Sequence, residues 1–582
     1  MNPGIQRRRL PADMSGLATL SPLLRRIYAT RGVSSLSELD HSLTAMAAPA
    51  QMKGIDRAAS ILAEAVIQRQ RLLIVGDFDC DGATSTALGV LALRALGAAH
   101  VDFLVPDRFK YGYGLTPEIV AVACERKPDV LITVDNGIAS IEGVKAARAA
   151  GITVVVTDHH LPGEILPDAD AIVNPNQGAC DFSSKAAAGV GVIFCVMTVL
   201  RKVLRERHWF AETGLKEPNM AQFLDLVALG TVADVVPLDQ NNRVFVEQGI
   251  RRIRAGNCRP GIRALVQIAG REMSGLTPMD LGFVVGPRLN AAGRLEDMSV
   301  GIECLITTSE QRAFDVAKEL DSLNQARKQI EQEMKAHAEV LVDEWLTGSG
   351  GELPWGLCLY DESWHQGVIG LLASRMKERL HRPVIAFAPA DDDAVWLKGS
   401  ARSIPGLHIR DTLDRVATQR PDILTKFGGH AMAAGMTVAA EHFDEFCRLF
   451  DSNVKAALSE SDLKALILTD GALAPEELTL ETAQMLRLAG PWGQQFPEPV
   501  FDGEFLVIQS RVLGGRHLKL VLGLPGHSVV FDAIAFQTEW ADGRSLPARV
   551  HIVYRPDVNE FRGETRLQLL ITHLSPAPVS GE

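Results

Sequence analysis

The stretch Leu72–Gly82 reads LLIVGDFDCDG and joins a short apolar run to three closely spaced aspartates. Two later stretches repeat this arrangement: LITV precedes Asp135-Asn136-Gly137, and VVVT precedes Asp158-His159-His160. Apolar runs of this length are typical of strands that are buried on both faces of a parallel sheet. Ligands of such sheets bind at the carboxyl ends of the strands. We therefore expect the three acidic clusters to converge on one crevice, although they span about 80 residues.

The region Arg71–Pro175 alternates between apolar runs and helix-like stretches. This alternation predicts an α/β domain with a parallel sheet covered by helices on both faces. The expected strands are Leu72–Gly76, Val101–Pro106, Asp129–Val134, Thr153–Thr157 and Ala171–Val173, and the expected helices are Ala83–Leu96, Pro117–Arg126 and Ile141–Ala150. A second helical zone is expected at Lys185–Glu206 and Ala221–Leu229.

The segment Thr308–Leu346 contains neither Gly nor Pro and predicts one long helix. Such a helix exceeds the usual length of a globular element, so we interpret it as a spacer. Thr308 and Gln311 have the spacing of a capping box at its start. A second α/β pattern begins at Leu357–Tyr360.

The chain becomes rich in strands from about Gly471. Five short strands separated by turn residues suit a small barrel such as an OB-fold, although a sandwich would give the same signal. The expected strands are Phe501–Ile508, His517–Leu522, Ser528–Ile534, Ala548–Tyr554 and Leu567–Ile571.

The composition narrows the class of protein. A chain of 582 residues is too long for one core, so several domains are expected. The net charge of −12 counts mildly against a nucleic-acid partner. The segment Arg243–Arg294, however, holds nine arginines against three acidic residues, so a basic surface would be local.

Cysteine usage and hydropathy indicate the compartment. The eight cysteines form no C-x-x-C pair, which argues against structural zinc and suits a reducing cytosol. The longest apolar run, Ala186–Leu200, is too short to cross a bilayer. We expect a cytoplasmic protein without a membrane partner.

Three carboxylates within five residues would repel one another in a dry cleft, and a divalent cation removes that repulsion. Oxygen ligands with one or two imidazoles favour Mg²⁺ or Mn²⁺, and two such ions can support phosphodiester hydrolysis. Asp and Gly after a strand are also common turn formers, and Asp158 could cap a helix. A calcium EF-hand loop is excluded, because its twelfth position would need glutamate and is Leu88 here.

The sequence resembles the DHH phosphoesterase superfamily and, within it, the RecJ family of exonucleases. The resemblance covers nearly the whole chain. The matching motifs are Asp77–Gly82, Asp135–Gly137, Asp158–His160, Gly230–Leu238 and Gly286–Arg294, followed by His365–Gly370, Gly399–Ser403 and Gly428–His430.

The resemblance implies a role for each matched position. Two ions, Mn²⁺ or Mg²⁺, would be held by Asp77, Asp79, Asp81, Asp135, His159 and Asp234, with Asp135 as the bridge and Asp77 acting directly or through water. His160 would contact the scissile phosphate, and Arg288 and Asn290 would approach it. A pocket for a terminal 5′-phosphate would use Arg402, Ser400 and Ser403, together with Arg108, Gly429 and His430. Read without the resemblance, Asp234 would be a polar helix cap, Arg108 a surface residue, and His365 and His430 partly buried histidines.

The resemblance also implies the domains and the activity. The expected parts are an N-terminal segment 1–50, a DHH catalytic domain 51–307, a connecting helix 308–347, a DHHA1-type domain 348–456 and an OB-like nucleic-acid-binding domain 465–582. The implied activity is two-metal hydrolysis of single-stranded DNA from its 5′ end to mononucleotides, in DNA repair and recombination, with single-strand-binding protein or a helicase as partners. The alternatives are a DHH phosphodiesterase on short oligonucleotides or cyclic dinucleotides, and a non-catalytic DNA-binding scaffold.

Overall fold

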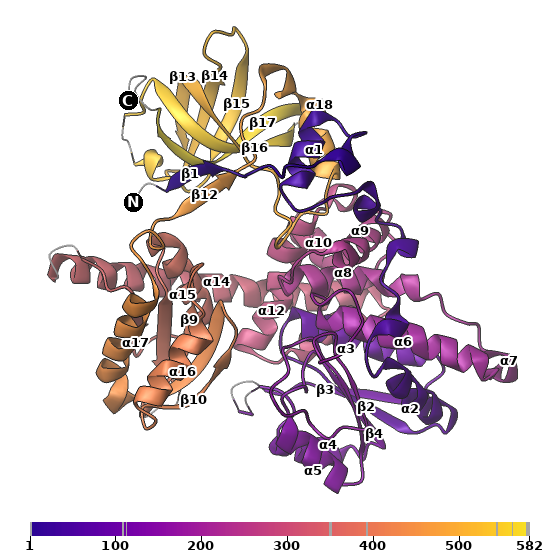
Figure 1. Ribbon diagram of the computed structural model, residues 1–582. Coiled ribbons are helices and arrows are strands. Elements are labelled where there is room, and N and C mark those ends of the chain that lie inside the picture. Colours follow the sequence, from indigo (N-terminus) through magenta and orange to yellow (C-terminus); the bar gives the residue numbers. More distant parts are fainter. Residues whose placement is uncertain are drawn as a thin grey trace. The chain divides into compact units, whose positions relative to one another are not determined.

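The computed structural model describes residues 3–107, 110–111, 113–348, 352–390, 394–542, 545–561 and 563–577 (Figure 1). The chain forms two compact units. One is built mainly from Asp321–Ile467, and the other mainly from Ile5–Gly293 and Leu468–Glu582. In the described part of the chain, no helix is both long and apolar enough to cross a membrane.

The predicted parallel sheet is confirmed. Its strands are β2 (Arg71–Val75), β3 (His100–Leu104), β4 (Val130–Val134), β5 (Thr153–Thr157) and β6 (Ala171–Val173). They lie in the order β3-β2-β4-β5-β6, and every neighbouring pair is parallel. All five strands therefore end at the same edge, which is the edge where the acidic clusters follow.

Helices cover both faces of this sheet because its strands are apolar on both sides. Leu73 and Val75 pack toward α4 (Pro117–Glu125) and α5 (Ile141–Ala149). The opposite face carries α3 (Cys80–Ala95) and α6 (Gly189–Glu206), both buried for most of their length. The predicted second helical zone contains α6 and α8 (Leu224–Ala233), and the helices α9 (Gln240–Arg254) and α12 (Gly286–Leu295) come after it in the chain.

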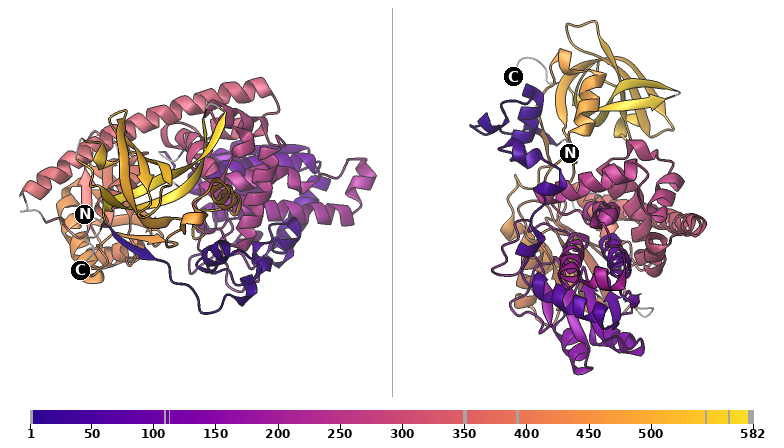
Figure 2. Two further views of the ribbon diagram at one scale, coloured as in Figure 1. Left: turned by 90° about the horizontal axis from the view of Figure 1, so that it is seen from above. Right: turned by 90° about the vertical axis from the view of Figure 1, so that its right-hand side faces the viewer.

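The predicted long helix is confirmed as α14 (Glu310–Gly348), an unbroken element of 39 residues (Figure 2). The predicted cap was wrong by one residue. The hydroxyl of Ser309, rather than that of Thr308, accepts from the Arg312 amide at 3.3 Å. Ser309 directly precedes the first helical residue, which is where a capping side chain reaches the amides of the first turn.

The second α/β unit contains a five-stranded sheet in the order β10-β11-β9-β8-β7. Its strands are β7 (Leu357–Tyr360), β8 (Val384–Pro389), β9 (Trp396–Arg402), β10 (Leu424–Gly429) and β11 (Ala433–Ala439). The helices α15 (Ile369–Leu380), α16 (Ile409–Gln419) and α17 (Phe443–Ala457) accompany it. Only β7 and β8 pair in parallel, so this sheet is mixed.

The C-terminal strands close into a barrel in the order β13-β14-β15-β17-β16. Their bounds are β13 (Phe501–Leu513), β14 (His517–Gly523), β15 (Val530–Ala535), β16 (Arg549–Phe561) and β17 (Glu564–Pro576). The OB-type prediction is confirmed, and closure rules out the sandwich.

The N-terminal segment packs on the chain that leads into this barrel. The hydroxyl of Tyr28, in α1 (Pro22–Ala29), donates to the Ala489 carbonyl at 2.7 Å. Arg31 forms a two-pronged ion pair with Asp470 at 2.7 and 3.0 Å. The segment is therefore part of the same compact unit as the sheet and the barrel.

Candidate metal centre

The acidic loop after β2 is shaped by helix α3, which begins within it. The carboxylate of Asp79 accepts from the Gly82 amide at 2.9 Å and caps α3. Asp81 lies in the first turn and is fully buried. Its two oxygens accept from the amides of Gly189 at 2.6 Å and Val190 at 3.0 Å, at the start of α6. The aspartates that shape this turn are thus the same ones that were predicted as metal ligands.

Asp135 follows β4 in a left-handed conformation with φ of 62°, which is uncommon for a residue with a side chain. Its amide donates to the Thr157 carbonyl at 3.1 Å, so the end of β5 supports this conformation. A Cβ at Gly189 would lie 2.7 Å from Oδ1 of Asp135. Glycine is needed there because α6 approaches the carboxylate so closely.

His159 lies among carboxylates from three elements. Its Nε2 is 3.0 Å from Oδ1 of Asp135, 3.6 Å from Oδ2 of Asp234 and 3.9 Å from Oδ2 of Asp81. Candidate ligand atoms form three groups, and within each group they lie no more than 4.8 Å apart: Asp77-Asp79-Asp135, Asp81-His159-Asp234 and Asp135-His159-His160. The third group shares Asp135 with the first and His159 with the second. The structure therefore brings together all six predicted metal ligands, with Asp135 in the middle.

The electrostatics of this cluster favour a bound cation. Burial and the nearby charge of Asp234 raise the pKa of Asp81 to about 7, and burial with Asp79 raises the pKa of Asp234 to about 7. Burial and Asp81 raise the pKa of Asp135 well above its ordinary value. Burial lowers the pKa of His159, which keeps the imidazole neutral and able to coordinate. The charges repel one another without a cation between them.

His160 is held differently from His159. Its Nδ1 lies 2.8 Å from Oδ1 of Asp158, which also accepts from the amides of His159 and His160. Burial lowers the pKa of His160, but the hydrogen bond to Asp158 and the negative charges of Asp158, Asp234 and Asp77 together outweigh burial and raise the pKa to about 9. The imidazolium is consequently cationic at neutral pH. Asp158 does not cap a helix; instead, its Oδ2 accepts from the Ile138 amide at 2.9 Å.

Helix α12 carries the two other residues predicted near the phosphate. The side-chain carbonyl of Asn290 accepts from the Cys80 amide at 2.8 Å and so ties α12 to the acidic loop. The guanidinium of Arg288 donates to the Val284 carbonyl at 2.6 Å, within the helical turn before α12.

In the second unit, Arg402 and Ser400 lie together on β9. The guanidinium of Arg402 donates to the Ser400 hydroxyl at 3.1 Å and to the Ala401 carbonyl at 2.8 Å. A Cβ at Gly370 would lie 2.9 Å from Nη2 of Arg402, so the guanidinium sits against the first turn of α15. Burial lowers the pKa of Arg402. Ser403 is separate, because its buried hydroxyl donates to the Leu407 carbonyl at 2.8 Å.

The remaining predicted residues follow two turns. Gly429 ends β10 with φ of 144°, and the His430 amide donates to the Ala433 carbonyl at 2.8 Å. Ala433 pairs with Arg402, so this hairpin turn lies beside β9. Nδ1 of His365 accepts from the Gly367 amide at 3.1 Å. Arg108 lies outside the described residues.

Three comparisons place the chain among known proteins. Family models described as "DHH family, N-terminal domain", "DHHA1 domain" and "RecJ OB domain" match residues 71–231, 355–456 and 469–573. The single-stranded-DNA-specific exonuclease RecJ of Dickeya dadantii is 54% identical over 99% of this chain and 100% of its own length. The chain belongs to the RecJ family. The Escherichia coli RecJ is 52% identical over 99% and 100% of the two chains. The crystal structure of RecJ with Mn²⁺ from Thermus thermophilus matches with a TM-score of 0.80 and 28% identity over 99% of this chain and 80% of that one.

Several residues that support this RecJ-family site were missed from the sequence. The side-chain Nδ2 of Asn176 donates to the His159 carbonyl at 2.6 Å, and the side-chain Nδ2 of Asn174 donates to the His160 carbonyl at 2.9 Å. The hydroxyl of Tyr113 lies 3.3 Å from the His160 ring nitrogens and from the Asp135 carbonyl oxygen. The two asparagines follow β6, so the strand-end rule that found the aspartates could have found them too.

Proposed function

We propose that the chain is a metal-dependent exonuclease that hydrolyses single-stranded DNA from its 5′ end and releases mononucleotides. One observation carries the proposal: the candidate ligand groups Asp77-Asp79-Asp135 and Asp135-His159-His160 share Asp135, in a chain that is 54% identical to a single-stranded-DNA-specific exonuclease. In the cell, this activity would serve DNA repair and recombination.

The residues fit two hard divalent cations. Oδ1 of Asp135, Oδ2 of Asp234 and Nε2 of His159 are buried and make no hydrogen bond to any described residue. Carboxylate oxygens with a neutral imidazole suit Mn²⁺ or Mg²⁺, and Thermus thermophilus RecJ has been crystallised with each. One ion would be held by Asp77, Asp79 and Asp135, and the other by Asp81, Asp135, His159 and Asp234. When bound, these ions would polarise the attacking water and offset the charge of the phosphate.

The side chains around the ions orient the substrate. The His160 imidazolium, fixed by Asp158, offers a positive charge and an N–H to a phosphate oxygen. Asn290 holds the Cys80 amide and thereby fixes the loop that carries three of the ligands. Arg288, two residues before Asn290 on α12, would add a further contact to the phosphate.

End selection would fall to Arg402 and Ser400. A guanidinium pressed against the first turn of a helix combines two sources of positive potential, and both favour an anion. The phosphate at the 5′ end of a strand carries more charge than an internal phosphate, and it would bind beside Arg402 and Ser400. Gly429 and His430, on the neighbouring hairpin, would line the same pocket.

The closed barrel would bind the strand that extends from the site, since such barrels combine exposed charge with stacking surfaces. We also propose the segment boundaries given above as domain limits. The chain would act together with a single-strand-binding protein or a helicase.

The test is digestion of single strands labelled at the 5′ or the 3′ end, with Mn²⁺ or with EDTA. The proposal requires early release of the 5′ label as mononucleotide, only with metal. A duplex of the same sequence serves as the control. Early release of the 3′ label would overturn the polarity. Cleavage restricted to dinucleotides would support a small-substrate phosphodiesterase, and binding without cleavage would support a scaffold.

A further inference from the structure

The outer edge of the parallel sheet is formed by β3. The Gly76 amide donates to the Leu104 carbonyl at 3.0 Å, so Leu104 directs its backbone groups toward the inside of the sheet. Successive residues of a strand direct these groups to alternate sides. Val101 and Phe103 consequently present theirs to the open edge.

Side chains of the same domain occupy these outward backbone groups. Arg94 donates to the Val101 carbonyl at 3.3 Å, and Arg126 donates to the Phe103 carbonyl at 2.5 Å. The Phe103 amide donates to the carboxylate of Asp102 at 2.9 Å, and Asp102 also pairs with Arg126 at 2.8 Å. An exposed edge strand can pair with a strand of another chain. In β3, charged side chains form hydrogen bonds with the backbone groups that such a strand would use.

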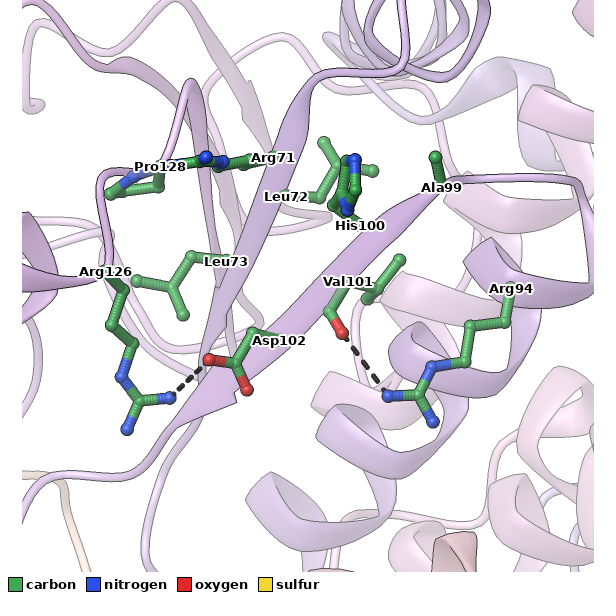
Figure 3. A pocket seen from close by; sticks show the side chains of 10 residues that line it. All are labelled: Arg71, Leu72, Leu73, Arg94, Ala99, His100, Val101, Asp102, Arg126 and Pro128. Carbon is green, nitrogen blue, oxygen red and sulfur yellow. Dashed lines mark hydrogen bonds and ion pairs between the residues drawn. The ribbon is translucent and has the colours of Figure 1, made fainter.

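A cavity of about 420 Å³ opens along this edge (Figure 3). The guanidinium groups of Arg94 and Arg126 flank β3 from either side, and Arg71 and His100 stand at the neighbouring starts of β2 and β3 (Figure 3). The charged lining thus has three arginines against one carboxylate, that of Asp102. Arg94 belongs to α3 and Arg126 follows α4, and these helices cover opposite faces of the sheet.

We propose that this edge accepts an extended acidic peptide segment of a partner protein as an additional strand. Side chains of an added strand point alternately to the two faces of a sheet. Two adjacent acidic residues would therefore reach Arg94 on one face and Arg126 on the other. The peptide backbone takes over the carbonyls of Val101 and Phe103, while the released guanidinium groups bind carboxylates.

The charge of the edge selects this occupant. A second copy of the chain would bring Arg94 and Arg126 against the same arginines, and like charges directly opposite one another are destabilising. A nucleic-acid strand has phosphates for the arginines but no backbone partner for the outward carbonyls. Arg71 and His100 lie at the amino ends of the strands, away from the metal ligands at the carboxyl ends. Occupation of the edge leaves the metal centre open.

The probe is a fluorescein-labelled nine-residue peptide of Thr and Val with a central Glu-Asp pair, measured by fluorescence anisotropy on the full chain. The matched peptide carries Gln-Asn in the centre. Two salt-bridged surface arginines elsewhere in the domain provide the control variant, Arg148→Glu/Arg205→Glu. We expect the acidic peptide to bind more tightly than the neutral one, and Arg94→Glu/Arg126→Glu to weaken it by at least roughly tenfold.

Strand addition has a second signature, because the acidic peptide must slow hydrogen exchange at the amides of residues 100–104. Arg94→Gln/Arg126→Gln keeps donors for the carbonyls but removes the charges, and it should weaken binding while nuclease activity stays unchanged. Equal affinity of both peptides, or equal binding by the wild type and the charge-reversed variant, overturns the proposal. Binding without protection of β3 also overturns it, as does a single-stranded oligonucleotide that displaces the peptide from this edge.

Discussion

The buried ion pair between Arg31 and Asp470 provides a quantitative test of how the N-terminal segment is attached. Both side chains are 1% exposed, and their two-pronged contact joins parts of the chain that are 439 residues apart. Asp470 also accepts from the Val500 amide at 3.0 Å. Asp470→Asn keeps the shape but removes the charge, which leaves a buried guanidinium uncompensated. Breaking a buried pair in this way costs about 3–5 kcal/mol.

The assay is hydrogen exchange of residues 22–31 followed by mass spectrometry. A loss of this size speeds exchange by roughly a hundredfold to a few thousandfold, provided that the segment opens locally. Glu217→Gln serves as the matched control, because it breaks the exposed Arg205–Glu217 pair, for which the expected loss is below about 1 kcal/mol. Arg31→Met/Asp470→Leu replaces both charges with apolar groups and should restore most of the protection. Equal exchange in Asp470→Asn and Glu217→Gln would show that the Arg31–Asp470 pair does not hold the N-terminal segment in place.

Three further predictions follow from the charges of the structure. Burial and the charge of Asp81 raise the pKa of Asp135 well above its unfolded value, so the metal-free fold binds extra protons and loses stability as pH rises above the ordinary pKa range of an aspartate. Asp135→Asn should flatten this pH dependence in thermal melts with EDTA, and equal slopes for the two proteins would contradict the prediction. Arg402→Ala should remove most of the preference for digesting 5′-phosphorylated over 5′-hydroxyl strands. Arg402→Lys should restore this preference only partly, since an ammonium cannot make the two-pronged contact. If Arg402→Ala slows the digestion of both strands equally, the residue serves general catalysis or folding. Arg511 and Lys519 face each other across β13 and β14, both exposed, so replacing both with Ala should make the log–log salt dependence of strand binding shallower by roughly 1.4, with an unchanged slope showing that this face does not bind the strand.

The strand ends and the gathering of acidic side chains beyond them were predictable because their signals are local. An apolar run followed by Asp77, Asp135 or Asp158 places the side chain at the carboxyl edge, and the parallel order of the strands then brings the clusters together. Asp234 was different. It stands at the C-terminal end of α8, so without the family motif its sequence indicates only a polar helix cap.

Other features depend on contacts that no local pattern encodes. The sequence around Arg402 suggests that Ser400 and Ser403 share one pocket, but the chain turns after β9 and buries the Ser403 hydroxyl against Leu407. The attachment of Tyr28 and Arg31 to the segment before the barrel joins residues more than 430 positions apart, so neither periodicity nor spacing predicts it. The charged edge of β3 could not be predicted from the sequence either, because Arg94 lies on α3 and Arg126 follows α4, far apart in the chain.

We propose that side chains from four segments meet at Asp135 and form one metal-dependent site for strand cleavage. The most direct measurement is the initial rate of nucleotide release from a 5′-phosphorylated single strand in Mn²⁺, for the wild type and for Asp135→Asn, with folding of both verified by thermal melts in EDTA. Loss of the shared ligand should lower the rate by roughly a thousandfold or more while the fold persists. A folded variant that retains more than about a tenth of the wild-type rate would contradict the shared-ligand site.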